Sequence, residues 1–233
     1  MTPNAVSFQD LLERLERFYG LLPRPPRGAF ALYAWEVMSV YATPPRRDAA
    51  MTALRRIRAL TPDAIARAPR GKLEAAVRPA GPYLEERLRA LTAGADVFRR
   101  NPRLPRQLRA PLPEATQAIA LLPHLSTASG HWLLLFAGDH PLVPADPRLT
   151  RVVLRLGYGE QGDDVSLAVA SAQKAVAEAL GDDVGVLQQA ALYLTHHGLT
   201  TCVEADPHCQ VCPLLDACPF PAARSVHSEG AGL

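Results

Sequence analysis

The chain has 233 residues, 48% of them hydrophobic, and its formal net charge at pH 7 is only +2. This length can bury a substantial core in one large domain or two smaller ones. A membrane-spanning protein is not expected, because no apolar run approaches ~18 residues. A secreted protein is not expected either, because Asp10 and Glu13 interrupt the stretch that a signal peptide would keep apolar. We therefore expect a cytoplasmic protein without a membrane partner.

Helix is the expected secondary structure throughout. Alanine, leucine and arginine outnumber valine, isoleucine and threonine, and this balance favours helix over sheet. The first helix is expected to begin at a capping box formed by Ser7 and Asp10. Its apolar stripe comprises Phe8, Leu11, Leu12, Leu15 and Phe18.

Helical periodicity continues along the chain, and no pair of strands is evident, so the predicted fold class is all-α. The proline-rich residues 101–113 predict a loop, and Gly198 is expected to cap the last helix. Residues 221–233 are predicted to be disordered. Further helices are expected near residues 30–41, 49–60, 62–68, 84–98, 114–121, 128–137, 147–156, 163–180 and 184–197.

Arginine supplies almost all of the positive charge, since Lys72 and Lys174 are the only lysines in the sequence. The arginines gather in two clusters, which either neutralise phosphate groups or form solvated helix faces. The first cluster contains Arg46, Arg47, Arg55, Arg56 and Arg58, and the second contains Arg99, Arg100, Arg103, Arg106 and Arg109.

All four cysteines lie in one short segment, with the spacing C-x6-C-x2-C-x5-C formed by Cys202, Cys209, Cys212 and Cys218. Clustered cysteines in the cytosol bind metal more often than they form disulfides. Four thiolates are the usual ligands of a [4Fe-4S] cluster, which is the expected cofactor. A zinc site is the alternative, although zinc sites usually contain two C-x2-C pairs and this segment has one. Free thiols are the third possibility.

This cysteine pattern resembles the iron–sulfur loop of the endonuclease III family, which belongs to the helix-hairpin-helix DNA glycosylases. Three earlier segments also resemble motifs of that family, and the resemblance covers about residues 30–220. Residues 81–83 look like its G-[LF]-Y segment, residues 122–128 lie where the family has its hairpin, and residues 146–157 look like its V-D-T-H segment. His197-Gly198 looks like the start of the family's H-G-x-x-x-C sequence.

The resemblance implies an all-α protein of two domains, with double-stranded DNA in the cleft between them and a damaged base flipped into that cleft. Residues 30–145 would form a six-helix barrel that contains a degenerate helix-hairpin-helix. Residues 1–29 and 146–220 would form the iron–sulfur domain. A monomer is implied as well, and association with the nucleoid if the source is a prokaryote.

The hairpin departs from the family pattern, because His124 and Ser126 stand where the family has glycines. Histidine tolerates positive φ better than most residues, so we expect the turn to persist and DNA binding to be weakened. The alternative is that this segment is only a connector between helices. The DNA contacts that the resemblance implies here are His124, Leu125, Ser126, Thr127 and Ala128.

Ala128 occupies the position of the lysine that bifunctional members use to form a Schiff base with the sugar. A nucleophile for that step must be an amine, so efficient AP-lyase activity is not expected. Residual lyase activity would need an amine from Lys72, Lys174 or the N-terminus. Tyr41 aligns with a glutamine that helps fill the gap left by the flipped base. Tyrosine can stack on bases but lacks the amide's hydrogen bonds.

Asp146 matches the family's aspartate, which assists cleavage of the glycosidic bond by activating water or stabilising the oxocarbenium-like sugar. Asp146 followed by proline is also a good helix N-cap, and both roles can coexist. Arg148, which replaces the family's usual histidine, and Arg151 are candidates for phosphate contacts. For Arg151 a surface or ion-pair role is equally open.

Two functions are therefore considered. The first is a monofunctional DNA N-glycosylase of base excision repair, in which Asp146 acts with water. The second is an inactive or nearly inactive iron–sulfur DNA-binding paralogue, which keeps the scaffold but has lost the hairpin glycines, the lysine and the pocket glutamine.

Overall fold

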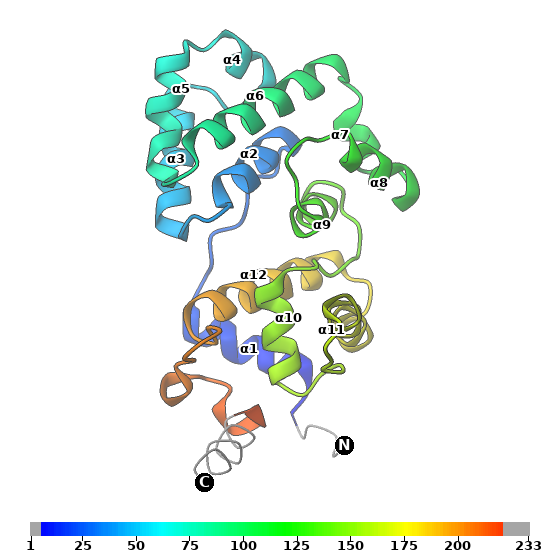
Figure 1. Ribbon diagram of the computed structural model, residues 1–233. Coiled ribbons are helices and arrows are strands. Elements are labelled where there is room, and N and C mark those ends of the chain that lie inside the picture. Colours follow the sequence, from blue (N-terminus) through cyan, green and yellow to red (C-terminus); the bar gives the residue numbers. More distant parts are fainter. Residues whose placement is uncertain (1–5, 221–233) are drawn as a thin grey trace. The chain divides into compact units, whose positions relative to one another are not determined.

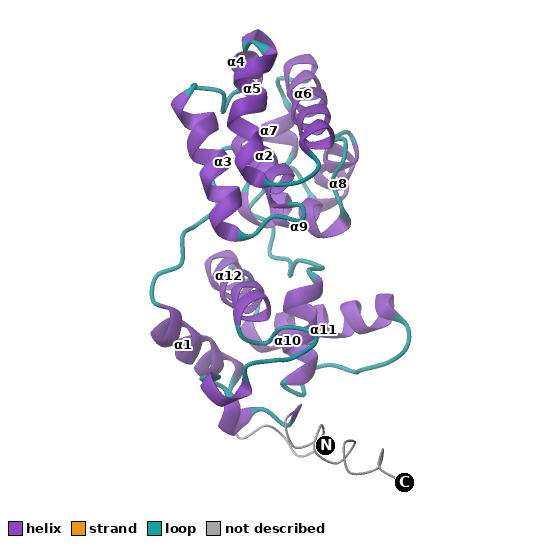
Figure 2. Ribbon diagram, turned by 60° about the vertical axis from the view of Figure 1, so that its left-hand side comes forward, coloured by secondary structure: helices purple, strands orange, loops and turns teal. Residues whose placement is uncertain are grey.

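The structure, a computed structural model, describes residues 6–220 (Figure 1). Within that range every regular element is a helix, as the colours of Figure 2 show, which confirms the all-α class. The chain forms two compact units, divided at residues 25 and 141 where the sequence predicted 30 and 146. We call residues 25–140 the hairpin unit, and residues 6–24 with 141–220 the cysteine unit. The predicted disorder of residues 221–233 concerns a segment outside the described range.

The hairpin unit consists of successive helices joined by short turns. In chain order they are α2 (Ala29–Ser39), α3 (Pro44–Arg56), α4 (Pro62–Arg67), α5 (Arg70–Val77), the 3₁₀ turn η1 (Arg78–Ala80), α6 (Leu84–Arg100), α7 (Leu104–Gln107), α8 (Leu112–Ala120) and α9 (Thr127–Phe136).

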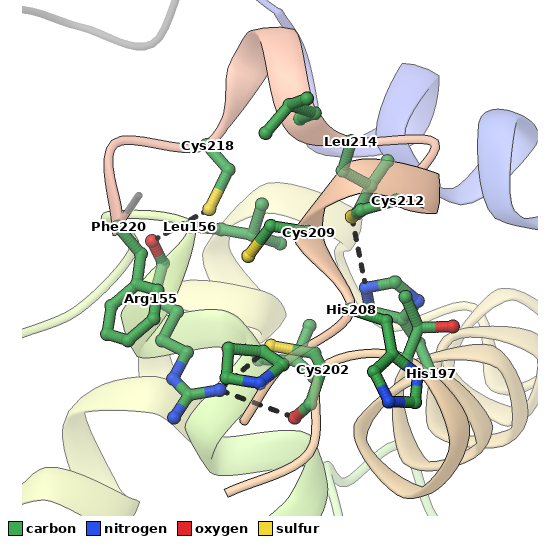
Figure 3. Close-up of a pocket in the computed structure, with 14 residues that line it drawn as sticks. Arg155, Leu156, His197, Cys202, His208, Cys209, Cys212, Leu214, Cys218 and Phe220 are labelled. Carbon is green, nitrogen blue, oxygen red and sulfur yellow. Dashed lines mark hydrogen bonds between the residues drawn. The ribbon is translucent and has the colours of Figure 1, made fainter. Parts of the chain in front are cut away.

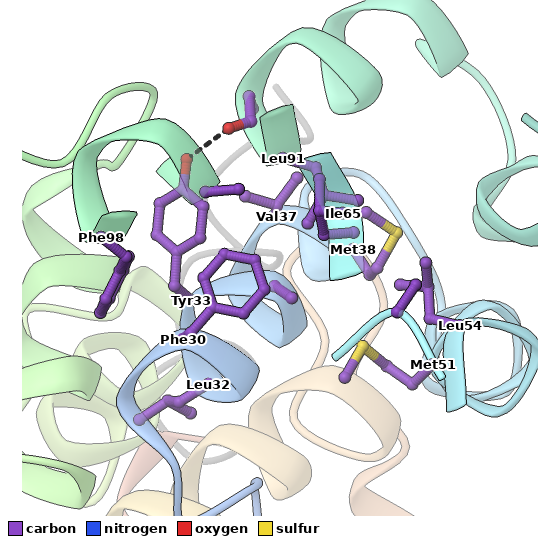
Figure 4. Close-up of a cluster of buried hydrophobic side chains, with 14 of the residues drawn as sticks. Phe30, Leu32, Tyr33, Val37, Met38, Met51, Leu54, Ile65, Leu91 and Phe98 are labelled. Atoms are coloured by element: carbon purple, nitrogen blue, oxygen red, sulfur yellow. Dashed lines mark hydrogen bonds between the residues drawn. The ribbon is translucent and has the colours of Figure 1, made fainter. Parts of the chain in front are cut away.

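The core of the hairpin unit is built around Tyr33 of α2, whose side chain is fully buried among aliphatic and aromatic residues (Figure 4). Its hydroxyl lies 2.7 Å from the carbonyl oxygen of Ala90 and 3.0 Å from that of Pro123. Gly94 of α6 faces the ring, where a Cβ atom would overlap it. Because Pro123 opens the turn between α8 and α9, the buried tyrosine fixes where that turn begins.

The cysteine unit combines one N-terminal helix with the C-terminal third of the chain. Its elements are α1 (Phe8–Tyr19), α10 (Pro147–Arg155), α11 (Val165–Leu180), α12 (Val184–Thr200) and the 3₁₀ turns η2 (Cys209–Val211) and η3 (Leu215–Ala217). The predicted capping box at the start of α1 is confirmed, since Ser7 Oγ accepts from the Asp10 amide and Asp10 bonds back to Ser7.

Helices α10 and α12 approach each other closely at Gly198. A Cβ atom there would lie 2.6 Å from the carbonyl oxygen of Arg148, so the position requires glycine. The prediction that Gly198 caps α12 is therefore wrong, because the helix continues to Thr200 and its C-cap is Thr201. The glycine serves helix packing instead of helix termination.

Two further expectations were wrong. Helix α5 was not predicted, and the expected loop of residues 101–113 contains the short helix α7. Pro105 lies in the first turn of α7, where its missing N–H is not needed. Phe18 belongs to the apolar stripe predicted for α1, but unlike the other four residues of that stripe it is exposed, at 49%. Among residues 6–220, no helix is long and apolar enough to cross a membrane.

Candidate functional site

The four cysteines line one small cavity of about 20 Å³ in the cysteine unit. All four are free thiols and partly buried, and in Figure 3 their sulfurs point toward a common space. Apolar side chains, among them Leu156, Leu214 and Phe220, line part of the rest of this cavity, and Arg155, His197, Thr201 and His208 also line it. The 3₁₀ turns η2 and η3 turn the chain back on itself, so that a segment of 17 residues presents four sulfurs to one point.

Four thiols are a donor set for either a single zinc ion or an iron–sulfur cluster. A tetrahedral zinc ion with Zn–S bonds of about 2.3 Å requires all its sulfurs to converge within about 4 Å of one another. In the part of the chain that the structure describes, no three His, Cys, Asp or Glu side chains are placed to hold one metal ion. Four thiols around a shared cavity fit a group in which each cysteine binds a different iron.

Two side chains outside the cysteine loop contact the ligand sulfurs. Arg155 of α10 lies with Nη1 3.4 Å from Cys202 Sγ, and it also donates to the carbonyls of Val203 and Glu204 at 2.7 and 2.9 Å. His197 of α12 lies with Nε2 3.6 Å from Cys212 Sγ (Figure 3). Neither contact was predicted, although both residues belong to segments that the sequence singled out.

Burial shifts the pKa values of three side chains that line this cavity. It raises the pKa of the Cys212 thiol to about 11 and raises the pKa of Cys218 as well. It also lowers the pKa of His197 to about 4, because the imidazolium loses hydration, and neighbouring His196 lowers it further. The free thiols of Cys212 and Cys218 are therefore protonated at neutral pH.

Asp146 is the N-cap of α10, as predicted, and its side chain is 1% exposed. Its Oδ1 accepts from the Arg148 amide and from Arg148 Nε, both at 2.9 Å, and its Oδ2 accepts from Arg148 Nη2 at 2.5 Å. Both carboxylate oxygens thus accept hydrogen bonds from one arginine. Arg148 therefore lies beside the candidate catalytic residue and is 40% exposed.

Arg151 is engaged by the protein itself. Its Nη2 donates to the carbonyl of Gly198 at 2.6 Å and its Nε to that of Cys202 at 3.0 Å. These acceptors lie at the end of α12 and at the first cysteine, so Arg151 holds the cysteine loop to α10. The contacts give Arg151 a structural role, and a phosphate contact from it stays a prediction.

The predicted hairpin turn persists without its glycines. His124 has φ +59°, so histidine adopts the left-handed conformation that the family assigns to glycine. Ser126 is the N-cap of α9 and accepts from the Ser129 amide at 3.1 Å. His124, Ser126 and Thr127 are exposed, while Leu125 and Ala128 are partly buried. Ala128 lies in the first turn of α9, at the exposed end of that helix.

The aromatic pair of Tyr41 and Tyr83 is a second exposed feature of the hairpin unit. Tyr41 is 79% exposed and Tyr83 is 53% exposed, and their ring centroids lie 5.3 Å apart. Both residues have positive φ, +49° and +66°. Two exposed aromatic side chains on strained backbone require another interaction to compensate their cost.

Arg87 of α6 holds the backbone beside Tyr41 in place, and the sequence analysis did not predict this role. It is 3% exposed, and its Nη2 donates to the carbonyl of Val40, the residue before Tyr41. Its Nε and Nη1 find no acceptor among the described residues. Burial lowers the pKa of Arg87. The only sequence signal is its place one helical turn after Tyr83, which does not distinguish a buried arginine from an exposed one.

Comparison with known proteins connects these features to a fold. No protein-family model and no curated protein matches the sequence. Among solved structures, a trapped endonuclease III–DNA covalent intermediate matches with a TM-score of 0.70 and 19% identity, over 93% of this chain and 96% of that one. A non-covalent endonuclease III–DNA complex matches over the same shares, with a TM-score of 0.71 and 18% identity. A thermostable thymine-DNA glycosylase matches with a TM-score of 0.67 and 14% identity, over 92% of this chain and 96% of that one. The chain therefore has the fold of the helix-hairpin-helix DNA glycosylases.

Proposed function

We propose that this protein binds double-stranded DNA and acts in base excision repair as a monofunctional N-glycosylase. The observation that carries the proposal is Asp146, a buried carboxylate at the N-terminus of α10 in a chain with the glycosylase fold. A buried carboxylate at the start of a helix suits electrostatic stabilisation of a developing positive charge.

The proposed reaction breaks the bond between the sugar C1′ and the base. Asp146 would stabilise the oxocarbenium-like sugar while the base leaves with its electron pair, and would accept a proton from the attacking water. Water supplies the oxygen, the departing base takes up the proton released to Asp146, and the products are a free base and an abasic site. Because Ala128 offers no amine, no covalent enzyme–sugar intermediate is expected.

DNA contacts are proposed for the hairpin and for the tyrosine pair. Residues 124–128 present an exposed turn and the N-terminus of α9, whose amides can approach a phosphate. Tyr41, with Tyr83 beside it, can stack on bases or fill space left by a flipped one. Arg148 is proposed to contact a phosphate, an interaction that would also draw it away from Asp146.

A second candidate is a DNA-binding paralogue without activity. The observation that favours it is the set of three hydrogen bonds that Arg148 donates to the Asp146 carboxylate, where the resembling family usually has histidine. Unless Arg148 moves on binding DNA, these bonds leave a water molecule at most one further acceptor position, on Oδ2. The two candidates therefore differ in whether this ion pair opens.

The test uses duplexes that contain oxidised pyrimidines, mismatched bases or an abasic site, incubated with the protein and then treated with borohydride. Base release without a trapped adduct supports the monofunctional glycosylase. A trapped adduct contradicts that claim, and Ala128→Lys, which restores the amine, is the positive control for trapping. Binding without base release in any duplex supports the inactive paralogue.

Variants at the ion pair sharpen this test. Asp146→Asn is expected to abolish base release, whereas Arg148→His is expected to preserve or raise it by freeing the carboxylate. The matched control is Asp164→Asn, because Asp164 caps α11 in the same unit through the amides of Ser166 and Leu167. Equal losses in Asp146→Asn and Asp164→Asn would show that only helix capping had been disturbed.

We further propose that Cys202, Cys209, Cys212 and Cys218 bind a [4Fe-4S] cluster, supported by the shared cavity and the four converging thiols. When bound, the cluster supplies a rigid anchor for the C-terminal loop. Iron and sulfide analysis of protein purified without oxygen is expected to give four of each per chain. A preparation that is folded and contains zinc but no iron would refute the assignment.

A further inference from the structure

A chain of hydrogen bonds leads from the N-terminal helix to one of the cysteines. Tyr19, the last residue of α1, places its hydroxyl 2.7 Å from His197 Nδ1 and 2.6 Å from Thr201 Oγ1. The other ring nitrogen of His197, Nε2, lies 3.6 Å from Cys212 Sγ. The chain thus runs from Thr201 through Tyr19 and His197 to Cys212, entirely within the cysteine unit.

The direction of these hydrogen bonds follows from the chemistry of a ligand thiolate. A thiolate carries no proton, so His197 Nε2 must be the donor to Cys212 Sγ. In the neutral imidazole Nδ1 then has a free lone pair and accepts from the Tyr19 hydroxyl. With its single proton used in this way, the Tyr19 oxygen accepts from Thr201. The thiolate thus determines the tautomer of His197, and the Tyr19 hydroxyl matches it by donating to Nδ1.

The imidazole has little freedom to turn away. His197 is 2% exposed, and its carbonyl oxygen accepts from the amides of Thr201 and Cys202 at 2.9 and 2.8 Å. The Tyr19 ring meets the His196 ring edge-on, with centroids 4.7 Å apart. The same turn of α12 is clamped at Gly198 against α10. The imidazole of His197 is thus buried, hydrogen-bonded at both nitrogens and directed at Cys212 Sγ. Close packing alone would not require these two hydrogen bonds.

We propose that Tyr19 and His197 are positioning residues for the iron–sulfur cluster, and that His197 donates a hydrogen bond to the Cys212 thiolate in the tautomer that Tyr19 stabilises by donating to Nδ1. The inference rests on the proposed cluster. A hydrogen bond to a ligand sulfur withdraws electron density from it and stabilises the more reduced, more negative state of the cluster. The chain therefore raises the reduction potential of the cluster and links it to α1.

The test compares reduction potentials of the purified iron-loaded proteins by spectroelectrochemistry, with iron content measured on each sample. His197→Phe, which removes the donor, is expected to shift the potential to a lower value. Tyr19→Phe removes one oxygen and leaves the imidazole in place, so its shift is expected in the same direction and smaller. His197→Gln, whose amide can donate, is expected to restore part of the difference.

The matched control is Tyr193→Phe. Tyr193 lies one turn before His197 on α12, and its hydroxyl donates to the carbonyl of Gly20 at 2.8 Å, so it also ties the end of α1 to α12. Its variant is expected to keep the wild-type potential. Wild-type potentials in both Tyr19→Phe and His197→Phe at full iron content would overturn the inference and leave the cluster assignment intact. Purified wild-type protein that contains no iron would overturn both the inference and the cluster assignment.

Discussion

The residues proposed to touch DNA in the hairpin unit are held differently from the residues of the cysteine unit. Tyr41, Tyr83 and His124 are exposed and have positive φ. Asp146 and His197, in contrast, are at most 2% exposed and bonded through both polar atoms of their side chains. The exposed residues carry backbone strain that a bound ligand can compensate. The polar atoms of the buried residues already have hydrogen-bond partners within the protein. Contact surfaces and built-in sites therefore leave different physical signatures in this chain.

The largest expected effect is the loss of Arg151, which tests how rigidly the cysteine unit is built. Arg151→Met leaves the carbonyl of Gly198 without its donor and that of Cys202 with only the 3.5 Å contact from Arg155, and is expected to cost about 2–3 kcal/mol of unfolding free energy. Denaturant unfolding measures the change, and hydrogen exchange in α10 and α12 assigns it to this unit.

The control is Arg89→Met in the hairpin unit, because Arg89 forms an exposed ion pair with Glu86 at 3.4 Å. Its expected effect is within about 0.5 kcal/mol. A loss from Arg151→Met no larger than that of Arg89→Met would contradict the comparison.

Replacement of Arg87 tests whether a buried arginine that lowers the stability of the hairpin unit is needed to position the exposed Tyr41. Arg87→Met removes a buried guanidinium with two unpaired nitrogens, so stability is expected to stay constant or rise by up to about 2 kcal/mol. DNA affinity is expected to fall, because Val40 loses the bond that positions Tyr41. Titration of a labelled duplex gives the affinity, and a variant that unfolds more easily but binds normally would reverse the assignment.

Relief of backbone strain at the hairpin has a smaller expected effect. His124→Gly is expected to stabilise the hairpin unit by about 1 kcal/mol, because glycine adopts φ near +59° without a Cβ clash. It is also expected to strengthen DNA binding by opening the turn to a phosphate. Asp139→Gly is the control, since Asp139 has φ +56° outside the hairpin turn. Equal gains in affinity for both variants would rule out a hairpin contact.

The smallest expected effect is a pH dependence from His131 of α9. Burial lowers the pKa of His131 below its ordinary value of 6.5, so the unfolded chain takes up a proton that the folded chain resists. The contribution of His131 to stability is therefore complete above pH 6.5 and declines as the pH falls toward the lowered value. Unfolding of wild-type and His131→Gln proteins, compared between pH 5 and 8, measures it, and parallel curves would show that His131 does not contribute.

Local features were predictable because short-range chemistry determines them. The capping box at Ser7 and the N-cap at Asp146 depend on side chains within three residues of the amides that they cap. The cysteine spacing predicts four thiols around one point, as the cavity shows. The positive φ at His124 followed from the family's glycine and the tolerance of histidine.

Features that depend on residues distant in the sequence were not predictable. Gly198 was misread because its reason is the backbone of Arg148, 50 positions earlier. Helix α5 was missed because its burial comes from α3 and α6 and not from a strong periodic stripe of its own. The burial of Arg87 and the partners of Arg151 required the helices to be placed in space.

The sequence by itself determined the helical class, the helix starts at Ser7 and Asp146, and the collection of four cysteines, since each follows from residue types at short spacing. Only the tertiary structure decided that Arg151 reaches the carbonyls of Gly198 and Cys202. It also decided that Tyr19 reaches His197 across 178 positions of sequence. Hydrogen bonds of this kind depend on how helices pack, and packing is settled by the buried surface of the whole unit and by no single segment.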